Sequence, residues 1–432
     1  MSDRRHEFEI AVVGAGPAGL SAACVAAEVG RRVALLDDTP WLGGQVWRGE
    51  ERHPGLPQAK QWFARFRRSG VTLLDQTSVI ASPRQGVLLA EHPAGPREIR
   101  FQKLILATGA RELLLPFPGW TLPGVMGPGG LQALVKNGWP VAGKKIVVCG
   151  TGPLLPAAAD GLKKHGANII CIAEQTPKAR LFRFGTKLLG HPAKFLQAAQ
   201  IKLRLSGIPF LTGVWPVRAE GADRVQSVTL TDGQKSWTEA CDLLACGFHL
   251  APNVELPLAL GCALSDDFVR VNEWQATSVE NVFCAGEPTG IGGADCALAE
   301  GRIAGHAAAE NPAEARRLFA VRARWHRFRL ALAEAFSLRP AVLALAADDT
   351  IFCRCEDVTL GRVKQFPGWR NAKLHTRCGM GACQGRICGA AAKALFGAGM
   401  ESVRPPVFPA RISSLLTLSA SANTLIETKP TL

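Results

Sequence analysis

The segment that most constrains the fold of this chain lies near its amino terminus. Residues 8–38 read FEIAVVGAGPAGLSAACVAAEVGRRVALLDD. An apolar run ends at a turn rich in glycine, a run of small residues follows, and a second apolar run ends in two aspartates. This order predicts a β-strand, a tight turn, an α-helix and a second, parallel strand, which together open a dinucleotide-binding domain.

Each residue type in this turn has a physical role. Gly14 permits the tight turn, Gly16 lets backbone N–H groups approach a pyrophosphate, and Gly19 lets the helix pack closely against the strand. The phosphate is expected at the helix N-terminus, where unpaired N–H groups favour anions, and Asp37 is placed to bind a ribose. The residues predicted to bind the nucleotide here are Gly14, Gly16, Pro17, Ala18, Gly19, Asp37 and Asp38.

Three later segments are predicted to reach the same ligand. They are WLGGQVWRG (41–49), with a glycine pair that brings backbone close, the buried strand KLILATGAREL (103–113), and the strand, glycine turn and helix NVFCAGEPTGIGGADCALAEGRIAG (281–305). Their predicted contacts are Gly44, Gln45, Arg48, Ala107, Thr108, Gly109, Gly286, Glu287, Gly293 and Ala294. The site is therefore expected to be assembled from segments that are far apart in the sequence.

A second strand–turn–helix–strand pattern covers residues 144–175, but its turn is altered. Leu155 stands where the third glycine is expected, Pro153 and Pro156 crowd the turn, and Glu174 ends the second strand. A side chain at 155 would hold the helix away from the strand, whereas Glu174 favours a free ribose hydroxyl over a 2′-phosphate. The pattern favours a vestigial or mononucleotide-binding domain over a working NADH site, with NAD or another adenine nucleotide as the alternative ligand.

Most of the thirteen cysteines are expected to be ordinary core residues. The chain has no secretory signal and no run of the ~18 apolar residues that span a membrane, so reduced thiols in the cytoplasm are expected. The cysteines in apolar strands and helices are Cys24, Cys149, Cys171, Cys241, Cys246, Cys262, Cys284 and Cys296. Because the chain has no C-x-x-C pair and no cysteine between residues 40 and 60, the sequence argues against a disulfide reductase.

The other cysteines cluster near the carboxyl end, in CRC (353–355) and RCGMGACQGRIC (377–388). Four of them, Cys353, Cys355, Cys378 and Cys383, precede or open predicted helices, where N–H groups stabilise thiolates. Four cysteine ligands without histidine predict a metal site that holds either an iron–sulfur cluster or structural zinc. In a redox protein the iron–sulfur cluster is favoured over zinc, because the cluster carries electrons.

The net charge of +14 is concentrated in particular stretches. No acidic residue lies between Glu174 and Glu220, and the cations there are Lys178, Arg180, Arg183, Lys187, Lys194, Lys202, Arg204 and Arg218. A second basic stretch, residues 316–336, has the pattern of an amphipathic helix. These stretches indicate either a docking surface for an acidic partner or anionic lipid, or an ordinary solvated face. No known nucleic-acid-binding motif accompanies them, so no nucleic-acid partner is expected.

The combination of motifs resembles the two-dinucleotide-binding-domain flavoproteins, the group that contains thioredoxin reductase. Over nearly its full length the chain is similar to the flavin- and iron–sulfur-containing subunits of heteromeric amine and amino-acid dehydrogenases, such as those of opine oxidase, D-hydroxyproline dehydrogenase and hydrogen cyanide synthase. The motifs that carry the resemblance are GAGPAG, GGQVWRG, ATGARELLLPFPGWTLPGVMGPGGLQ, GTGPLLPAAA, AGEPTGIGGAD, CRCED, RCGMGACQGRIC and VRPPVFP.

The resemblance implies two cofactors. FAD is expected at the first glycine turn and at Gly286-Glu287, where Glu stands in place of the usual Asp. A C-terminal domain similar to bacterioferritin-associated ferredoxin is expected to bind a [2Fe–2S] cluster. That pattern ends in C-x-x-C whereas this chain has C-x-x-x-x-C, so Cys388 is the alternative to Cys383 as a ligand.

The resemblance also implies a partner. Amine oxidation is expected on a separate subunit that resembles D-amino-acid oxidase, with room for a small third subunit, while this chain carries electrons and has no catalytic residue of its own. It is expected in the cytoplasm, where peripheral contact with the inner face of the membrane is compatible with the sequence. Two alternatives stay open: a self-contained NADH-dependent flavoprotein reductase, and a non-catalytic scaffold that its cofactors stabilise.

The expected fold is therefore α/β, with two Rossmann-like domains as in thioredoxin reductase and a small C-terminal iron–sulfur domain. The FAD domain is expected over 1–118 and 250–312 and the second Rossmann-like domain over 119–249. A basic helical linker is expected over 313–347, and the four-cysteine domain with its tail over 348–432.

Overall fold

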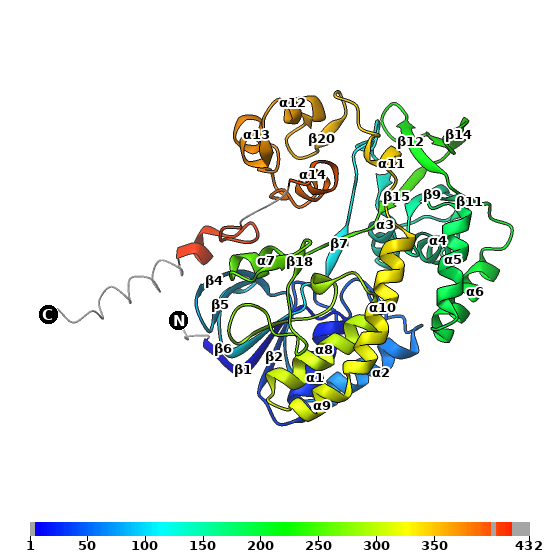
Figure 1. The fold of residues 1–432 in the computed structure, drawn as a ribbon. Helices are drawn as coiled ribbons and strands as arrows, with labels where there is room; N and C mark the ends of the chain where they lie inside the picture. The colour runs from blue at the N-terminus through cyan, green and yellow to red at the C-terminus, as the bar shows by residue number, and fades with distance from the viewer. Residues whose placement is uncertain (1–4, 399–402, 417–432) are drawn as a thin grey trace. The chain divides into compact units, whose positions relative to one another are not determined.

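The computed structural model describes residues 5–398 and 403–416 of the chain (Figure 1). The chain divides into two compact units. As far as these ranges are described, the first unit contains Met1–Arg111, Pro252–Arg329 and Ser402–Leu432, and the second contains Glu112–Ala251 and Leu330–Glu401. The division falls in the short strands β7 (Ala110–Glu112) and β16 (Leu250–Pro252) and within helix α10 (Phe319–Ala335).

A mainly parallel β-sheet forms the centre of the first unit. Its strands are β1 (Arg5–Val13), β2 (Val33–Leu36), β3 (Thr72–Leu74), β4 (Ser78–Arg84), β5 (Val87–His92), β6 (Gly95–Leu106) and β19 (Val282–Cys284). Strands β3, β2, β1 and β6 are parallel neighbours in that order, β19 pairs with β6 in parallel, and β5 and β4 continue the sheet in antiparallel orientation. The other elements of this unit are α1 (Pro17–Glu28), α2 (Pro57–Arg68), α7 (Glu255–Ala259), the hairpin β17 (Leu264–Ser265) and β18 (Phe268–Val269), η1 (Glu287–Thr289), α8 (Ala294–Ala308) and α9 (Pro312–Arg317).

Helices α1 and α8 pack with their backbones in contact, and glycines in α8 make this possible. A Cβ atom on Gly301 would lie 2.1 Å from the carbonyl oxygen of Ala18, and one on Gly305 would lie 2.4 Å from that of Ala22. Any side chain at these two positions would therefore push the helices apart. This contact holds the late segment against the first glycine turn, although nearly three hundred residues separate them.

The second unit contains a parallel sheet in the order β11, β10, β9, β15, β8. These strands are β11 (Phe210–Thr212), β10 (Asn168–Glu174), β9 (Lys145–Thr151), β15 (Leu243–Phe248) and β8 (Val125–Met126). An antiparallel sheet adds β12 (Trp215–Glu220), β13 (Ser227–Thr231) and β14 (Ser236–Ala240), and the helices are α3 (Pro128–Lys136), α4 (Leu154–Lys164), α5 (Lys178–Leu188) and α6 (Pro192–Arg204). The expected α/β class with two Rossmann-like sheets is confirmed.

The segment that bears the cysteine cluster packs against this second sheet's core. It contains α11 (Pro340–Leu343), β20 (Ile351–Cys353), β21 (Val358–Thr359), α12 (Leu360–Lys364), α13 (Gly368–Thr376) and α14 (Cys388–Phe396). Ile387 and Ala390 lie on the same apolar cluster as Leu114 and Phe248. The cysteine segment thus shares a core with the second Rossmann-like sheet, whereas the sequence suggested a domain of its own.

The described part of the tail belongs to the first unit. Val407 is buried in that unit's core, and its N–H donates to the carbonyl oxygen of Ile80 at 2.7 Å. Within the range expected as one C-terminal domain, 348–432, the described residues therefore divide between the units: 348–398 belong to the second and 403–416 to the first. Among the described residues, no helix has both the length and the apolar character needed to cross a membrane.

Candidate functional site

The first glycine turn leaves open space at one position only. A Cβ atom on Gly14 (φ +106°) would lie 2.2 Å from the Ala107 oxygen, and one on Gly19 would lie 1.8 Å from the Gly14 oxygen. Both glycines are therefore required for close packing of strand and helix. At Gly16, which caps the N-terminus of α1, a Cβ atom would meet nothing within 4 Å. The open space lies at the end of the helix that attracts anions.

The loop at 41–49 packs onto this turn as predicted. The N–H of Gly43 donates to the Ala15 oxygen at 2.9 Å, and a Cβ atom on Gly44 (φ +56°) would lie 2.9 Å from the Gly16 Cα. Farther along the loop, the Nε of Arg48 is buried and has no hydrogen-bond partner among the described residues. A buried donor without an acceptor is costly, so this guanidinium is suited to a ligand that supplies one.

The carboxylate of Asp37 ties the end of β2 to the glycine turn. It accepts the N–H of Ala15 at 2.6 Å through one oxygen, and the N–H and hydroxyl of Thr39 at 2.9 and 2.6 Å through the other. Next to it, partial desolvation and the negative charge of Asp37 raise the pKa of Asp38, while the charge of Arg48 opposes that rise. The acidic pair thus lies beside the open turn, where a ribose is expected.

The Gly286–Glu287 pair is held against α1. A Cβ atom on Gly286 (φ +84°) would lie 2.9 Å from the Ala18 Cβ, so the turn approaches the helix closely. The carboxylate of Glu287 accepts the N–H groups of Gly293 at 2.9 Å and Gly292 at 3.2 Å. Desolvation raises the pKa of Glu287 to about 7. In this arrangement Glu287 caps the N-terminus of α8, where Gly293 and Ala294 lie.

The Ala-Thr-Gly segment after β6 completes the group of predicted contacts. The N–H of Ala107 donates to the Val13 oxygen at 2.8 Å, which joins this segment to the end of β1. Thr108 and Asn253 are joined by two hydrogen bonds. The Thr108 hydroxyl donates to the backbone carbonyl oxygen of Asn253 at 2.6 Å, and the side-chain amide of Asn253 donates to the backbone carbonyl oxygen of Thr108 at 2.8 Å. The structure therefore brings all four predicted segments together within the first unit.

A buried network behind the Gly286 turn was not predicted from the sequence. Glu300 is only 1% exposed, and one oxygen of its carboxylate accepts the N–H of Gly286 and the hydroxyl of Thr289, each at 2.8 Å. The other oxygen lies 2.7 Å from His326 Nε2 and 3.8 Å from Arg329 Nη1. A buried carboxylate with these partners fixes the conformation of the turn. No spacing in the sequence connects Glu300 with His326.

In the second unit, the glycine turn is held by hydrogen bonds to a buried carboxylate of the chain itself. Glu174 is buried, with 1% of its surface exposed. Its carboxylate accepts the Thr151 hydroxyl at 2.8 Å, the Thr176 N–H at 2.9 Å and the Gly152 N–H at 2.7 Å. The acid predicted to bind a ribose hydroxyl therefore stabilises its own turn. Leu155 is fully buried in the core beneath α4, in agreement with a turn that has lost its third glycine.

A segment of the chain itself also lies over this turn. The Phe336 oxygen lies 2.6 Å from His249 Nε2, and Gln175 both donates to the Ser337 oxygen at 3.1 Å and accepts the Arg339 N–H at 3.2 Å. These contacts put Phe336–Arg339 at the carboxyl ends of β10 and β15. Nucleotides bind at this edge of parallel sheets, so the segment stands where a dinucleotide would lie.

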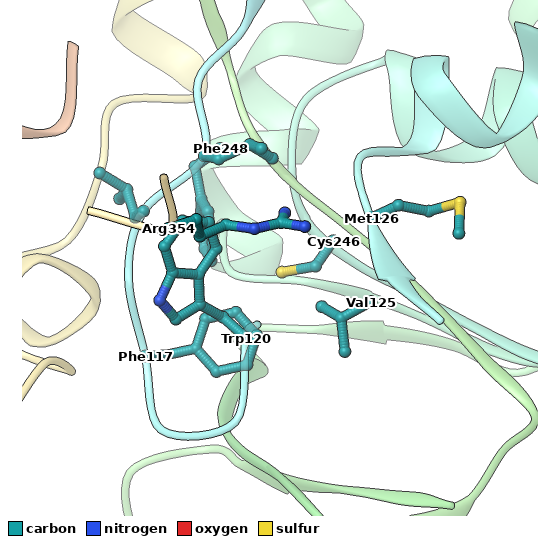
Figure 2. Close-up of a pocket in the computed structure, with 9 residues that line it drawn as sticks. Phe117, Trp120, Val125, Met126, Cys246, Phe248 and Arg354 are labelled. Carbon is teal, nitrogen blue, oxygen red and sulfur yellow. The ribbon is translucent and has the colours of Figure 1, made fainter. Parts of the chain in front are cut away.

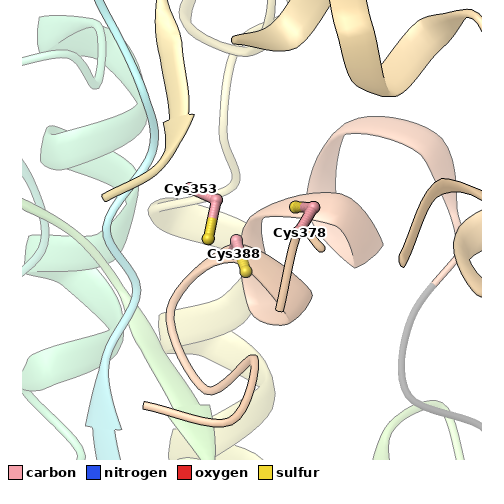
Figure 3. Close-up of side chains that lie close together, drawn as sticks. All are labelled: Cys353, Cys378 and Cys388. Carbon is pink, nitrogen blue, oxygen red and sulfur yellow. The ribbon is translucent and has the colours of Figure 1, made fainter. Parts of the chain in front are cut away.

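The cysteine cluster contains five thiols in the second unit. The sulfur atoms of Cys353, Cys378 and Cys388 all lie within 4.8 Å of one another, and all three residues are buried (Figure 3). Cys355 and Cys383 line a pocket together with Cys353 and Cys388. The predicted ligands Cys353, Cys355, Cys378 and Cys383 are thus brought near one another, together with the alternative ligand Cys388.

An open pocket of about 320 Å³ lies between these thiols. Cys353, Cys355, Cys383 and Cys388 line it, with Leu114 and Ile387 as apolar walls, but Cys378 does not. Glycines let the cysteine loop approach: a Cβ atom on Gly381 would lie 2.4 Å from the Cys355 Cβ. Four thiols around one open pocket are a donor set that suits an iron–sulfur cluster or zinc.

Arg354, between the first two cysteines, attaches the cluster to the second sheet. Its guanidinium lies 5.3 Å from the ring of Trp120, and the indole N–H of Trp120 donates to the Ile351 oxygen at 2.6 Å. Figure 2 shows Arg354 and Trp120 in a narrow pocket with Phe248 and Cys246. Strand β20, which ends in Cys353, is therefore anchored to the loop before β8.

The remaining eight cysteines are all buried, which confirms that they are core residues. Six of them lie in strands or helices, whereas Cys241 and Cys262, also expected in such elements, lie in the connections next to them. Burial raises the pKa of the Cys24 thiol to about 11 and those of Cys171 and Cys241 to about 12. Thiols with such pKa values are protonated at neutral pH and are poor nucleophiles.

The sheet order and the glycine turns define a flavoprotein oxidoreductase fold. The chain belongs to the pyridine nucleotide-disulphide oxidoreductase family, which matches residues 8–301. It is thus an oxidoreductase of a family that binds an FAD-type flavin, as the motifs predicted.

Relatives that match most of the chain agree with the resemblance noted in the sequence. The HcnB subunit of hydrogen cyanide synthase from Pseudomonas aeruginosa is 33% identical, over 87% of this chain and 90% of that protein. An opine oxidase subunit from Rhizobium meliloti is 30% identical, over 98% of this chain and 90% of that protein. Both are named as subunits.

Two solved structures have the same fold. The L-proline dehydrogenase from P. horikoshii gives a TM-score of 0.67 at 20% identity, covering 95% of this chain and 80% of that one. The thioredoxin reductase of T. acidophilum gives a TM-score of 0.55 at 22% identity, covering 71% of this chain and 99% of that one.

Proposed function

We propose that this chain is the electron-transfer subunit of a heteromeric amine, amino-acid or opine dehydrogenase, in which FAD and a [2Fe–2S] cluster are its cofactors. The observation that carries the proposal is the pocket of cysteines in a chain of a flavoprotein family. The donor subunit would resemble D-amino-acid oxidase, with or without a small third subunit, and the acceptor would be a soluble carrier or a quinone. The relatives that are named as subunits of a synthase and an oxidase support this assignment.

The first unit fits an FAD molecule. The open space at Gly16 and the N-terminus of α1 would receive the pyrophosphate, and Asp37 and Asp38 lie where the ribose hydroxyls would be. The buried Nε of Arg48, which has no partner among the described residues, would donate to the cofactor. When bound, FAD supplies the exchange between two-electron and one-electron transfer. Glu300 holds the Gly286 turn in the conformation that faces this space.

The second unit fits a cluster, and we assign Cys353, Cys355, Cys383 and Cys388 as its ligands. These four thiols line one pocket, whereas Cys378 does not line it, although its sulfur lies within 4.8 Å of those of Cys353 and Cys388. The set predicted from the sequence was Cys353, Cys355, Cys378 and Cys383, with Cys388 as the alternative to Cys383. The pocket instead favours Cys388 in place of Cys378. A [2Fe–2S] cluster supplies one-electron transfer. Such a cluster and its reduced thiols suit the cytoplasm, where we locate this chain.

Cysteine variants test the cluster and its ligands. Protein purified without oxygen should contain about two irons and two sulfides per chain. Cys388→Ser should lose most of this iron, because a hard oxygen ligand holds iron–sulfur clusters poorly, whereas Cys378→Ser should keep it. Cys241→Ser is the control and should keep the iron as well, because Cys241 is buried in the same unit between β14 and β15, away from the cysteine pocket. Loss of iron in Cys378→Ser but not in Cys388→Ser would restore the set that the sequence suggested, and stoichiometric zinc without sulfide would refute the electron-transfer role.

The alternative of an NADH-dependent reductase requires a nucleotide at the second turn. Leu155, the burial of Glu174, which is 1% exposed, and the overlying segment Phe336–Arg339 all oppose this. The alternative of a scaffold predicts a cluster and a flavin that no electron donor reduces. We favour electron transfer over both alternatives. A scaffold whose hydrophobic core already stabilises it would not need cysteines arranged around an open pocket.

A further inference from the structure

Helices α5 and α6 in the second unit lack a buried side that would match their apolar content. They lie next to each other (Figure 1), and neither contains a single buried residue. Helix α4, which packs against β9 and β10, buries five residues. Two helices of eleven and thirteen residues without a buried side chain are unusual, because helices in globular proteins are stabilised mainly by packing an apolar face.

The apolar residues of these helices project outward. The inward side is defined by Phe184, whose ring lies 5.3 Å from that of Phe336, by Ile201, which packs on the core beneath α4, and by Arg204, which bonds to Asp160 at 2.7 Å. By contrast, Phe182 is 77% exposed and Leu203 is 76% exposed.

The exposed side chains also line up. Phe182 and Leu189 are seven residues apart on α5 and its C-terminal cap, and Leu196 and Leu203 are seven apart on α6. Residues at this spacing lie on one face of a helix. The result is an outward apolar stripe on each helix.

Cations surround this apolar surface without compensating acids from the same stretch. No acidic residue occurs between Glu174 and Glu220. From neighbouring elements, Glu334 pairs with Lys187 at 2.6 Å and Asp160 pairs with Arg204, while Lys178 and Lys202 have no ion-pair partner among the described residues. Lys178 lies one helical turn before Phe182, on the same face of α5. Lys202, which precedes Leu203 in the sequence, is exposed beside the stripe of α6.

We propose that the surface formed by Phe182, Leu189, Leu196, Leu203, Lys178 and Lys202, the α5–α6 face, docks on the surface of an anionic lipid bilayer. Outward phenylalanine and leucine would enter the boundary between headgroups and acyl chains, while the lysines would bind the anionic headgroups. A second copy of the chain would bring like charges together, and a nucleic acid would leave the apolar side chains without a partner. The α5–α6 face is independent of the flavin and cysteine sites.

Vesicle binding by the full-length, flavin-containing protein tests this proposal. The protein should sediment with vesicles made of equal parts phosphatidylcholine and phosphatidylglycerol but not with vesicles of phosphatidylcholine alone, and added salt should weaken the binding. Leu203→Ser should reduce the binding constant about tenfold, as expected for the loss of one inserted leucine. Lys202→Gln should reduce it about fivefold, as expected for one surface charge.

The chain offers a matched control. Leu374, on α13, is 65% exposed, almost the same as Leu189 at 66%, but lies outside the α5–α6 face. Leu374→Ser should therefore bind vesicles as the unchanged protein does, and Leu189→Ser should not. Failure to bind anionic vesicles, or equal losses in Leu374→Ser and Leu189→Ser, would overturn the proposal. So would a dimer in light scattering that Leu203→Ser dissociates, because the face would then be an interface between copies.

Discussion

The three glycines of the first turn are alike in sequence but differ in what surrounds them. Gly14 and Gly19 face backbone atoms at distances that exclude any side chain, whereas Gly16 faces open space. The first two serve the fold, and a change at either should damage the strand–helix contact itself. Gly16 has an ordinary backbone conformation, with φ of −72°, so a side chain there would cause no strain in the protein. We therefore propose that the missing side chain at Gly16 leaves room for the flavin's pyrophosphate.

Gly16→Val should therefore fold and yet lose the flavin. The valine would occupy the space that the pyrophosphate needs, and its Cβ atom would meet no protein atom within 4 Å. Absorbance of the purified variant should show no flavin, while circular dichroism and oligomeric state should match those of flavin-free protein prepared from the unchanged chain.

Gly185→Val is the matched control for this change. A Cβ atom at Gly185 also meets nothing within 4 Å, and the backbone there is helical, but the residue is on α5 in the other unit. This variant should keep its flavin. A full yellow spectrum in Gly16→Val would contradict the assignment of the turn.

At the scale of elements, the second turn was only partly predictable. Leu155 and the crowding prolines indicated a damaged dinucleotide site, and the buried leucine agrees. The segment Phe336–Arg339 over the same turn could not be predicted, because its contacts with Gln175 and His249 join positions far apart in the sequence. Such contacts depend on tertiary packing, which no local pattern records.

NADH should neither bind at the second glycine turn nor stabilise the protein. A ligand that binds only the folded state adds about 2.7 kcal/mol to the free energy of unfolding at one hundred times its dissociation constant, which a thermal melt detects. We expect no change in the melting temperature with NADH. FAD added to flavin-free protein is the positive control and should raise the melting temperature. An increase with NADH that depends on its concentration would favour the reductase.

At the scale of the whole molecule, the order of motifs was enough to predict the fold class and the family. Glycine turns and their flanking strands are local patterns, so the first turn and the late Gly-acid pair were found from the sequence. The units were harder to predict, because the cysteine segment shares a core with the second sheet through Ile387 and Ala390. Likewise, the sequence offered Cys388 only as the alternative to Cys383, because spacing alone does not show which thiols line the pocket.

Electron paramagnetic resonance of the anaerobic full-length protein tests the central claim most directly. With dithionite as reductant, the spectrum should contain the spin-one-half signal of a reduced [2Fe–2S] cluster, with an intensity near one spin per chain. With NADH in place of dithionite, that signal should be absent, because the second turn is closed. A dithionite-treated sample without the signal, or an NADH-treated sample with it at full intensity, would contradict the account.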